Sequence, residues 1–500
     1  MLRASGILLS ISSLPSNYGI GCFSKEAYEF VDKLCEAGQS FWQILPLGPT
    51  GYGDSPYQSF STFAGNPYFI DLEKLISNGL LTKEECDAVD FGEDNEKVDY
   101  GKLYKGRYKL LKKAFENSNI NENNAFKEFQ KENSFWLEDY SLFMAAKEKY
   151  DNQSWHNWDK EIRLRDKEAL EKLKEELKEQ IDFQKYMQFE FFGQWKELKS
   201  YANSKGIKII GDIPIYVSLD SADAWANPQL FYLDSDNKPT GIAGCPPDGF
   251  SATGQLWGNP LYNWDYHKET GFSWWIKRIE YCYKLYDILR IDHFRGFDEY
   301  YSIPFGATSA IDGRWEKGPG IELFKAMEAK LGKREVIAED LGYLTDSVRK
   351  LVDDCGFPGM KVLEFAFDSR DSSGAQHYFP YNYKENSVVY TGTHDNETIA
   401  GWFKNITEEE RNMARLYLNN RYTPENEIYW DFVCLAMASV SKWCVIPMQD
   451  YLGLDNSARM NTPSTVSVNW KWRLPKSAFD KSLAEKIYSI TGCYGRLPKD

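Results

Sequence analysis

The sequence has few of the residues that most metal, nucleotide and nucleic-acid sites require. Only 5 histidines occur in 500 residues, and the 9 cysteines form no C-x-x-C pair, so neither a zinc site nor a disulfide framework is indicated. Lys and Arg (59) are outnumbered by Asp and Glu (74), and the net charge of −15 opposes binding to nucleic acid. The glycine pairs at 19–21 and 51–53 lack a third glycine and a following lysine, so no phosphate-binding loop is predicted.

Long apolar runs and export signals are also lacking. No stretch approaches the ~20 apolar residues of a membrane span. The apolar segment 6–9 is followed by serines and Pro15, which is more typical of a strand than of a signal peptide. We therefore expect a soluble, cytoplasmic protein with no membrane partner. Aromatic residues are abundant (16 Trp, 32 Tyr, 30 Phe), and their flat faces suit the C–H faces of sugars, although many of them must belong to the core.

Strand and helix signals alternate along the whole chain. Apolar runs of strand length alternate with segments of helical spacing at 24–38, 271–286, 321–331 and 347–354. This order predicts an α/β fold, a (β/α)8 TIM barrel with helical and loop insertions, in which residues 1–500 form a single catalytic domain. The eight expected strands lie within segments 5–12, 41–46, 207–217, 287–296, 335–342, 359–367, 387–396 and 442–449.

Two segments interrupt this order. Residues 72–201 carry charged helical patterns and few strand signals, which predicts a mainly helical insertion subdomain after strand two. A partner-binding arm is one interpretation, but alternating Lys and Glu along its helices favours a solvated insertion folded onto the barrel. The segment 234–262 is too rich in Gly and Pro to form a long regular element. It is either a surface turn or an active-site loop, and we expect the latter because Phe250, Gln255 and Trp257 are costly to expose without a ligand.

Three of the apolar runs end abruptly in charged residues. In a parallel barrel the bodies of the strands form the core, and their C-terminal ends with the following loops form the active site. Each acid alone could be a helix cap, but three acids, two histidines and an arginine at strand ends are harder to explain in that way. Segment 287–296 presents Arg290, Asp292 and His293, segment 335–342 presents Glu339, and segment 387–396 presents His394 and Asp395.

These acids occur without a metal-spaced His or Cys cluster and without a Gly-x-Ser-x-Gly elbow, which indicates acid/base and carboxylate-nucleophile chemistry. Glycoside cleavage is the template: one carboxylate attacks the anomeric carbon while a second acid protonates the leaving oxygen. Arg290 lies two residues before Asp292 and so on the same face of the strand, where its charge would keep the carboxylate ionised. A purely structural ion pair is the alternative for Arg290.

Several motifs are long enough that chance agreement with a known family is negligible. They are Ser-Ser-Leu-Pro at 12–15, Ser-Pro-Tyr-Gln at 55–58, Phe-Ser-Ala-Thr-Gly-Gln-Leu-Trp-Gly-Asn-Pro at 250–260, Arg-Ile-Asp-His-Phe-Arg-Gly at 290–296, Ala-Glu-Asp-Leu-Gly at 338–342, Gly-Thr-His-Asp-Asn at 392–396 and Arg-Met-Asn-Thr-Pro at 459–463. Through most of its length the chain resembles the 4-α-glucanotransferases (amylomaltases or disproportionating enzymes) of glycoside hydrolase family 77. The related α-amylases carry a His and an Asn where Val217 and Thr393 stand here, and both differences favour the transferases.

The resemblance implies roles for individual residues. Asp292 would be the nucleophile, Glu339 the general acid/base and Asp395 a third carboxylate that binds hydroxyls of the distorted sugar. Gly249 stands where some family members have an aromatic residue, so that substrate contact is either missing or taken over by Phe250. The other implied substrate contacts come from Tyr57, Asp212, Arg290, His394 and Asn461, with acceptor-side contacts from Gln255 and Trp257.

The resemblance also implies an activity: transfer of an α-1,4-glucan segment to the 4-hydroxyl of another glucan or of glucose, through a covalent glycosyl-enzyme intermediate. The implied partners are α-1,4-glucans and maltooligosaccharides, with no cofactor and no metal, and we expect a monomer or weak homo-oligomer. Two other interpretations stay open. A hydrolase would share the first step but use water as the acceptor, and a catalytically inactive glucan-binding or scaffold protein would not need all three acids.

Overall fold

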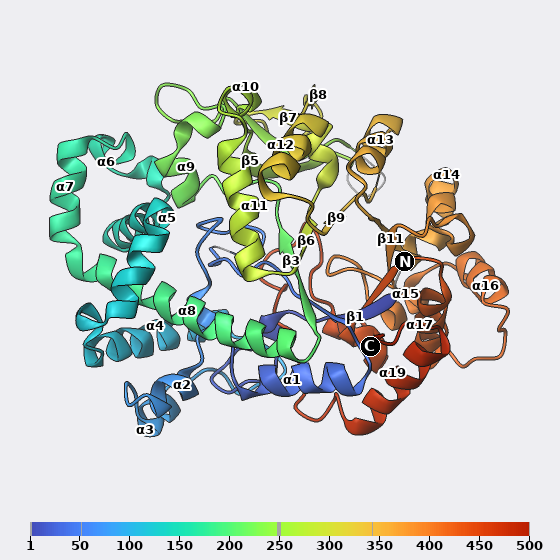
Figure 1. Cartoon of the computed structure of the whole chain (residues 1–500). Coiled ribbons are helices and arrows are strands. Elements are labelled where there is room, and N and C mark those ends of the chain that lie inside the picture. Colours follow the sequence, from blue (N-terminus) through green and yellow to red (C-terminus); the bar gives the residue numbers. More distant parts are fainter. Residues whose placement is uncertain (1–2, 52, 248–251, 343, 500) are drawn as a thin grey trace.

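Eight parallel strands close into a barrel in the computed structural model, which describes residues 3–51, 53–247, 252–342 and 344–499 (Figure 1). Neighbouring strands follow the order β1-β12-β11-β10-β9-β6-β3-β2, and β2 pairs with β1 to close the ring. The predicted (β/α)8 TIM barrel is therefore confirmed. The strands are β1 (Ala4–Leu8), β2 (Phe41–Gln43), β3 (Lys208–Ile213), β6 (Ile288–Ile291), β9 (Val336–Ala338), β10 (Gly359–Val362), β11 (Ser387–Tyr390) and β12 (Trp443–Pro447).

Alternation along the strands decides which side chains face the barrel interior. Successive side chains of a strand point to opposite faces. Ile288 of β6 belongs to a buried cluster to which all eight barrel strands contribute, whereas Leu289 and Ile291 belong to the larger cluster under the helices. The same alternation turns Arg290 and Asp292 inward, at the end of the strand where the apolar residues stop. β3 and β9 repeat this pattern. The barrel interior is therefore apolar along the bodies of the strands and charged at their C-terminal ends.

Amphipathic helices cover the outside of the barrel. One of them, α11, buries an apolar face that includes Trp275, Ile279 and Leu285. No helix among the described residues is long and apolar enough to cross a membrane. The helices outside the insertion after β2 are α1 (Lys25–Glu36), α8 (Lys178–Ser204), α9 (Ala222–Ala226), α10 (Trp264–Glu269), α11 (Ser273–Leu285), α12 (Ile321–Leu331), α13 (Asp346–Cys355), α15 (Ile399–Asn405), α16 (Glu408–Tyr417), α17 (Ile428–Ala438), α18 (Met448–Leu452) and α19 (Lys481–Cys493).

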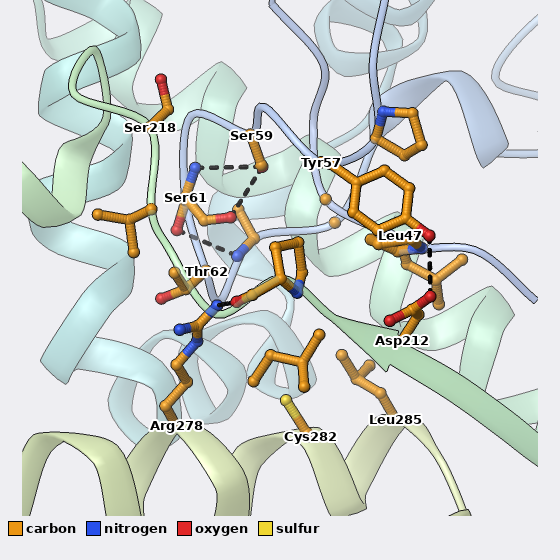
Figure 2. Close-up of a pocket in the computed structure, with 18 of the residues that line it drawn as sticks. Leu47, Tyr57, Ser59, Ser61, Thr62, Asp212, Ser218, Arg278, Cys282 and Leu285 are labelled. Atoms are coloured by element: carbon orange, nitrogen blue, oxygen red, sulfur yellow. Dashed lines mark hydrogen bonds between the residues drawn. The ribbon is translucent and has the colours of Figure 1, made fainter. Parts of the chain in front are cut away.

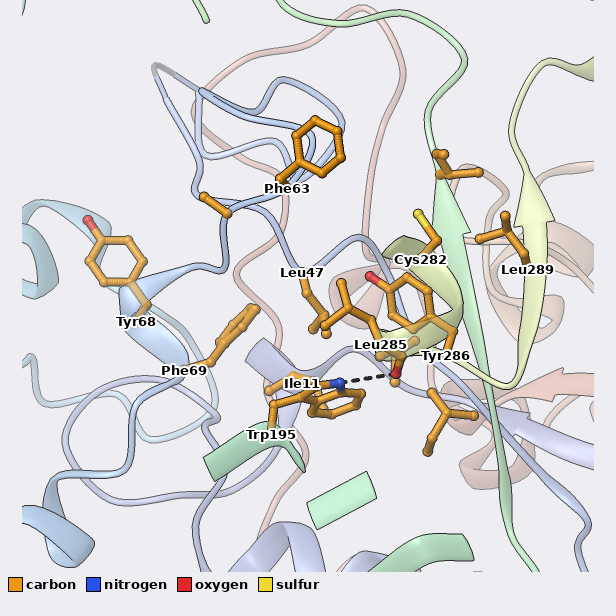
Figure 3. Packing of buried hydrophobic residues seen from close by; sticks show 14 of the residues in the cluster. Ile11, Leu47, Phe63, Tyr68, Phe69, Trp195, Cys282, Leu285, Tyr286 and Leu289 are labelled. Carbon is orange, nitrogen blue, oxygen red and sulfur yellow. Dashed lines mark hydrogen bonds between the residues drawn. The ribbon is translucent and has the colours of Figure 1, made fainter. Parts of the chain in front are cut away.

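Large aromatic side chains join these helices to the rest of the core. Trp195 of α8 is buried, and its indole Nε1 donates a 3.0 Å hydrogen bond to the carbonyl oxygen of Leu285 at the end of α11 (Figure 3). The ring of Phe23 packs against Trp195 at 5.2 Å and against Phe69 at 5.9 Å. The segment after β1, the segment after β2 and two barrel helices therefore share one apolar core.

The residues between β2 and α8 form the largest addition to the barrel and lie to one side of it (Figure 1). The helical pattern predicted for this segment is interrupted at Leu177 (φ −101°, ψ 20°), which separates the helix Lys167–Glu176 from α8. That residues 72–201 form a subdomain of their own stays a prediction. The helices of this segment are α2 (Leu72–Ser77), α3 (Lys83–Asp87), α4 (Tyr100–Asn117), α5 (Asn124–Lys149), α6 (Lys160–Arg163) and α7 (Lys167–Glu176).

A small antiparallel sheet, which the sequence pattern did not predict, joins the segments that follow β3 and β6. Its strands pair in the order β5-β4-β7-β8. Much of the expected active-site loop 234–262 belongs to this sheet, so its backbone is more regular than its Gly and Pro content indicates. The strands are β4 (Gly241–Cys245), β5 (Gln255–Pro260), β7 (Glu299–Pro304) and β8 (Arg314–Lys317).

The connection between β10 and β11 departs from the regular alternation of strands and helices. The predicted strand at 359–367 is only half correct: β10 ends at Val362, and Leu363–Phe367 is a 3-10 helix. The N–H of Glu364 still donates to the carbonyl oxygen of Thr391 at 3.4 Å, so one contact with the chain after β11 persists beyond the end of β10. In the described part of this connection only short helical turns follow, among them α14 (Ser372–Ala375), in place of a full barrel helix.

Candidate active site

The C-terminal ends of β6 and β9 bring two carboxyl groups into one site. The strands pair in parallel with Ile291 opposite Ala338, so Asp292 and Glu339 come next in register. The N–H of Glu339 donates to the carbonyl oxygen of Ile291 at 3.0 Å, which extends the pairing to this position. Paired strands lie ~4.8 Å apart, and both side chains point to the same inner face.

Backbone donors fix the carboxylate of Glu339. The N–H of His293 donates to Oε2 at 2.6 Å and the N–H of Leu341 donates to Oε1 at 2.9 Å. His293 adopts φ 49° and ψ 49°, a left-handed conformation that is uncommon for a residue with a side chain. This turn aims its N–H at Glu339, and such strain is typically concentrated at functional sites.

Arg290 joins the acids of β3 and β6. Its Nη1 donates to both carboxylate oxygens of Asp212, at 2.7 and 2.6 Å, and to Oδ1 of Asp292 at 3.0 Å. The side chains of Arg290 and Asp212 are 4% and 0% exposed, whereas that of Asp292 is 28% exposed. One guanidinium therefore forms a buried pair with Asp212 and also lies against the partly exposed Asp292.

Tyr57, in the loop after β2, contacts the Arg290–Asp212 pair through Asp212. Its hydroxyl donates to Oδ2 of Asp212 at 2.8 Å, at one end of a small hollow of about 60 Å³ (Figure 2). The ring of Tyr57 stacks on the ring of His394 with centroids 4.8 Å apart and planes 18° from parallel. The loop after β2 is thereby fixed to the ends of both β3 and β11.

The end of β11 adds a third carboxylate from the far side of the ring of strands. Oδ2 of Asp395 lies 3.3 Å from Nε2 of His394, and Oδ1 accepts a 2.6 Å hydrogen bond from Nδ2 of Asn461. The side chain of Asp395 remains 49% exposed. Its carboxylate is therefore oriented by two neighbours yet open to a ligand in the barrel mouth.

The antiparallel sheet contributes Gln255 and Trp257 from β5. The indole Nε1 of Trp257 donates to Oε1 of Gln255 at 3.1 Å, and its ring meets the ring of His293 edge-on at 4.8 Å. Both residues thus lie beside the turn that follows Asp292. Phe250 was also predicted to contact substrate, but it lies outside the described residues, as does Gly249.

The two acids at neighbouring strand ends differ in their electrostatic surroundings. Burial raises the pKa of Asp292 to about 6, against the opposing charge of Arg290. Burial, and then the charge of Asp292, raise the pKa of Glu339 to about 7. This order follows from the contacts, because Arg290 touches Asp292 directly. Of the two acids, Glu339 therefore holds a proton more readily and Asp292 ionises more readily.

Asp395 is the most acidic of the three. Burial alone would raise its pKa, but the charge and hydrogen bond of His394, and then the hydrogen bond of Asn461, hold the pKa of Asp395 below its usual range. Burial likewise opposes the charged form of His394, yet Asp395 raises the pKa of that imidazole. Asp395 is therefore an acceptor-only group, suited to sugar hydroxyls.

The helix-cap interpretation of these acids fails. The 3-10 helix Phe294–Phe297 that follows Asp292 has no side-chain cap, α13 after Glu339 is capped by Thr345, and α15 after Asp395 is capped by Thr398. Among the described residues no group of three or more His, Cys, Asp or Glu could hold a metal.

Comparisons with known proteins identify the family of the chain. The family model described as 4-alpha-glucanotransferase, glycoside hydrolase family 77, matches residues 9–478. The chain belongs to this family. A 4-alpha-glucanotransferase of Clostridium butyricum is 51% identical over 490 residues, covering 98% of this chain and 100% of that protein. One from Thermus thermophilus is 47% identical, with 94% and 95% covered. The structure of the Streptococcus agalactiae amylomaltase in complex with acarbose superposes with a TM-score of 0.95 at 46% identity, covering 99% of this chain and 100% of that one.

Two further residues of this 4-α-glucanotransferase family member lie at the site without having been predicted. Arg459 donates from Nη2 to the carbonyl oxygen of Asp395 and from Nε to that of Asn461 at 2.7 Å. The ring of Trp470 lies 5.9 Å from the rings of both Tyr57 and His394. Arg459 belongs to the motif 459–463, so the sequence could have identified it as a site residue. Nothing in the sequence around Trp470 distinguishes it from a core residue.

Proposed function

We propose that the protein transfers a segment of an α-1,4-glucan to the 4-hydroxyl of an acceptor glucan or of glucose, with retention of configuration. The observation that carries this proposal is the pair of acids at the adjoining ends of β6 and β9, of which Asp292 lies against Arg290 and Glu339 has the higher pKa. Retaining glycoside chemistry needs an ionised nucleophile and a protonated acid on neighbouring positions.

The proposed reaction has two displacements. First, a carboxylate oxygen of Asp292 attacks the anomeric carbon, the glycosidic bond breaks, and Glu339 gives its proton to the departing 4-oxygen. Second, Glu339 takes the proton of the acceptor's 4-hydroxyl, whose oxygen attacks the same carbon and releases Asp292. The number of glycosidic bonds is unchanged, and Glu339 returns to its protonated form.

The remaining predicted residues are assigned to substrate binding. Asp395, oriented by His394 and Asn461, would accept hydrogen bonds from hydroxyls of the sugar whose anomeric carbon reacts. Tyr57 and Asp212 would border the donor side through their contact with Arg290. Gln255 and Trp257, with Phe250 on the same segment, would contact the acceptor sugar, since aromatic faces pack against C–H surfaces.

Incubation with maltotriose alone tests the activity. Disproportionation should give glucose and a ladder of longer maltooligosaccharides, while the concentration of reducing ends stays nearly constant. A steady rise in reducing ends without longer products would instead identify a hydrolase. The Asp292→Asn variant, in parallel, separates both outcomes from a contaminating enzyme.

An inactive glucan-binding protein is the alternative from another class. It would bind maltooligosaccharides without changing them, so the same chromatogram would show maltotriose alone. The arrangement of Arg290, Asp292 and Glu339 gives no support to this alternative, because a binding protein gains nothing from two acids with raised pKa values side by side. A cytoplasmic location and a monomeric or weakly associating state stay predictions.

A further inference from the structure

A second cavity lies on the outside of the barrel wall, where the connection between β10 and β11 lacks a full helix. Its volume is about 360 Å³, within the ~300–1,000 Å³ typical of small-molecule sites. Among the described residues that line it, none is one of the three acids of the active site. Its charged lining residues are three cations, Arg349, Lys361 and Lys384, and two acids, Asp340 and Asp353.

Lys361 is the most deeply placed of these groups. It lies on β10 between Met360 and Val362, which face the barrel interior, so its own side chain points outward into the space under the missing helix. Its Nζ lies 5.5 Å from the ring centre of Tyr378. Within the described parts of the chain, the ammonium has neither an ion-pair partner nor a hydrogen-bond acceptor. Burial lowers the pKa of Lys361, as expected for a charge that is withdrawn from water.

The nearest acid, Asp340, raises the pKa of Lys361 through its charge but forms no ion pair with it. Oδ1 of Asp340 accepts a 2.7 Å hydrogen bond from the N–H of Met360, and burial raises the pKa of Asp340 to about 6. Its carboxylate packs tightly over Gly359, where an added Cβ would come within 2.4 Å of Oδ2. Asp340 thus serves the pairing of β9 with β10, and it is not within ion-pair distance of Lys361.

The other two cations, Lys384 and Arg349, form exposed ion pairs that a ligand could replace. Lys384 pairs with Asp353 at 2.9 Å, and Arg349 pairs with Asp346 at 3.1 Å, with all four side chains at least 40% exposed. Exposed pairs of this kind contribute only ~0–1 kcal/mol. Both cations act on Lys361 electrostatically and lower its pKa further. The cavity therefore combines one fixed, unpaired ammonium with two cations that can turn towards a ligand.

Polar groups beside the cations fit a hydroxylated ligand. The side-chain amide of Asn382 donates to the carbonyl oxygen of Gln376 at 2.8 Å, and that of Asn386 donates to the carbonyl oxygen of Gly356 at 3.1 Å. Their amide oxygens are then left to accept hydrogen bonds from hydroxyl groups.

We propose that this cavity binds a small molecule that carries a phosphoryl group, with Lys361 as its main contact and Arg349 and Lys384 as flanking contacts. A phosphate monoester supplies up to two negative charges and three acceptor oxygens, which suit three cations that line one cavity. Inorganic phosphate and a hexose monophosphate share this chemistry, and the volume of the cavity exceeds what phosphate alone would fill. The proposal is independent of the reaction at Asp292.

Calorimetric titration of the full-length protein tests the proposal, with glucose 6-phosphate, inorganic phosphate, sulfate and glucose as separate titrants at constant ionic strength. We expect saturable one-to-one binding of a phosphoryl compound. Glucose 6-phosphate binding more tightly than phosphate identifies a sugar phosphate, and equal affinities identify the phosphoryl group alone. Absence of saturable binding by both, or equally tight binding of sulfate, overturns the proposal.

Variants place the binding in this cavity. Lys361→Met keeps the length of the side chain and should weaken binding at least ~10-fold, which is ~1.4 kcal/mol. Lys384→Met, at an exposed position that tolerates substitution, should weaken it several-fold. Lys350→Met is the matched control, because Lys350 is 73% exposed on α13, pairs with Asp354 and does not line the cavity. Unchanged affinity in both Lys361→Met and Lys384→Met, with melting temperature and maltotriose transfer intact, refutes the site.

Discussion

Replacing Arg290 with Met should move the whole pH profile of transfer to higher pH. In the proposed mechanism activity needs an ionised Asp292, so the acid limb should follow the pKa of Asp292. It also needs a protonated Glu339, so the alkaline limb should follow the pKa of Glu339. Arg290 lowers both pKa values, and it is the first opposing influence on Asp292. Loss of its charge should therefore move the midpoints of both limbs to higher pH. Because the two acids are coupled, these midpoints describe the pair rather than either residue alone.

The size of the effect follows from the contacts of Arg290. Once the pKa of Asp292 lies above the assay pH, each further unit lowers its ionised fraction, and with it the rate, approximately tenfold. Arg290 also pairs with the buried Asp212 at 2.6 Å, and removing one partner of a buried pair costs about 3–5 kcal/mol of folding stability. The Arg290→Lys variant keeps the charge and should show a smaller shift of both limbs.

The assay is the initial rate of glucose release from maltotriose against pH at subsaturating substrate, with calorimetric melting at each pH to exclude unfolding. Lys208→Met is a suitable control, since Lys208 begins β3 at the opposite end of the barrel, is 55% exposed and pairs only loosely with Glu335 at 3.4 Å. Limbs of Arg290→Met that coincide with those of the wild type would refute the assignment of Arg290 to the ionisation of Asp292.

Three further substitutions probe the nucleophile, its surroundings and the core. Asp292→Asn should lose many orders of magnitude in kcat with the fold retained, and retention of more than about a tenth of the activity, ~1.4 kcal/mol, would place the nucleophile elsewhere. Tyr57→Phe removes the 2.8 Å hydrogen bond to Asp212, a charge-assisted contact of about 1.5–3 kcal/mol, so kcat/KM should fall roughly 10- to 100-fold; a change below twofold would contradict this role. Trp195→Phe leaves the carbonyl oxygen of Leu285 without its donor and should lower the free energy of unfolding by about 1–3 kcal/mol in urea titration, without changing KM.

The inner-face acids could be predicted because the signal for them is local. A period-two pattern that ends in Arg290 and Asp292 gives both the strand and the face on which the charges lie, and Glu339 follows the same rule one strand away. The order of strands follows from the fold class once the alternation of strands and helices is recognised.

Features that depend on distant pairing could not be predicted in the same way. β4 pairs with β7 across the whole of α11 and β6, and Asn461 reaches Asp395 from the segment after β12. Buried acids outside the site also escape a sequence pattern: Glu364 is buried and contacts Asn396, although a Glu within an apolar run normally marks an exposed position. In each case the contacting residue is distant in the sequence and is brought near only when the barrel closes.

The most direct measurement is the mass of the intact Glu339→Gln variant after addition of α-maltosyl fluoride. Fluoride leaves with little help from an acid, so the first displacement should still proceed, but the amide cannot take the proton of an incoming hydroxyl. A covalent maltosyl adduct should therefore accumulate, map by peptide digestion to Asp292, and be absent from Asp292→Asn/Glu339→Gln. The absence of any adduct in Glu339→Gln, or an adduct on another residue, would contradict the account.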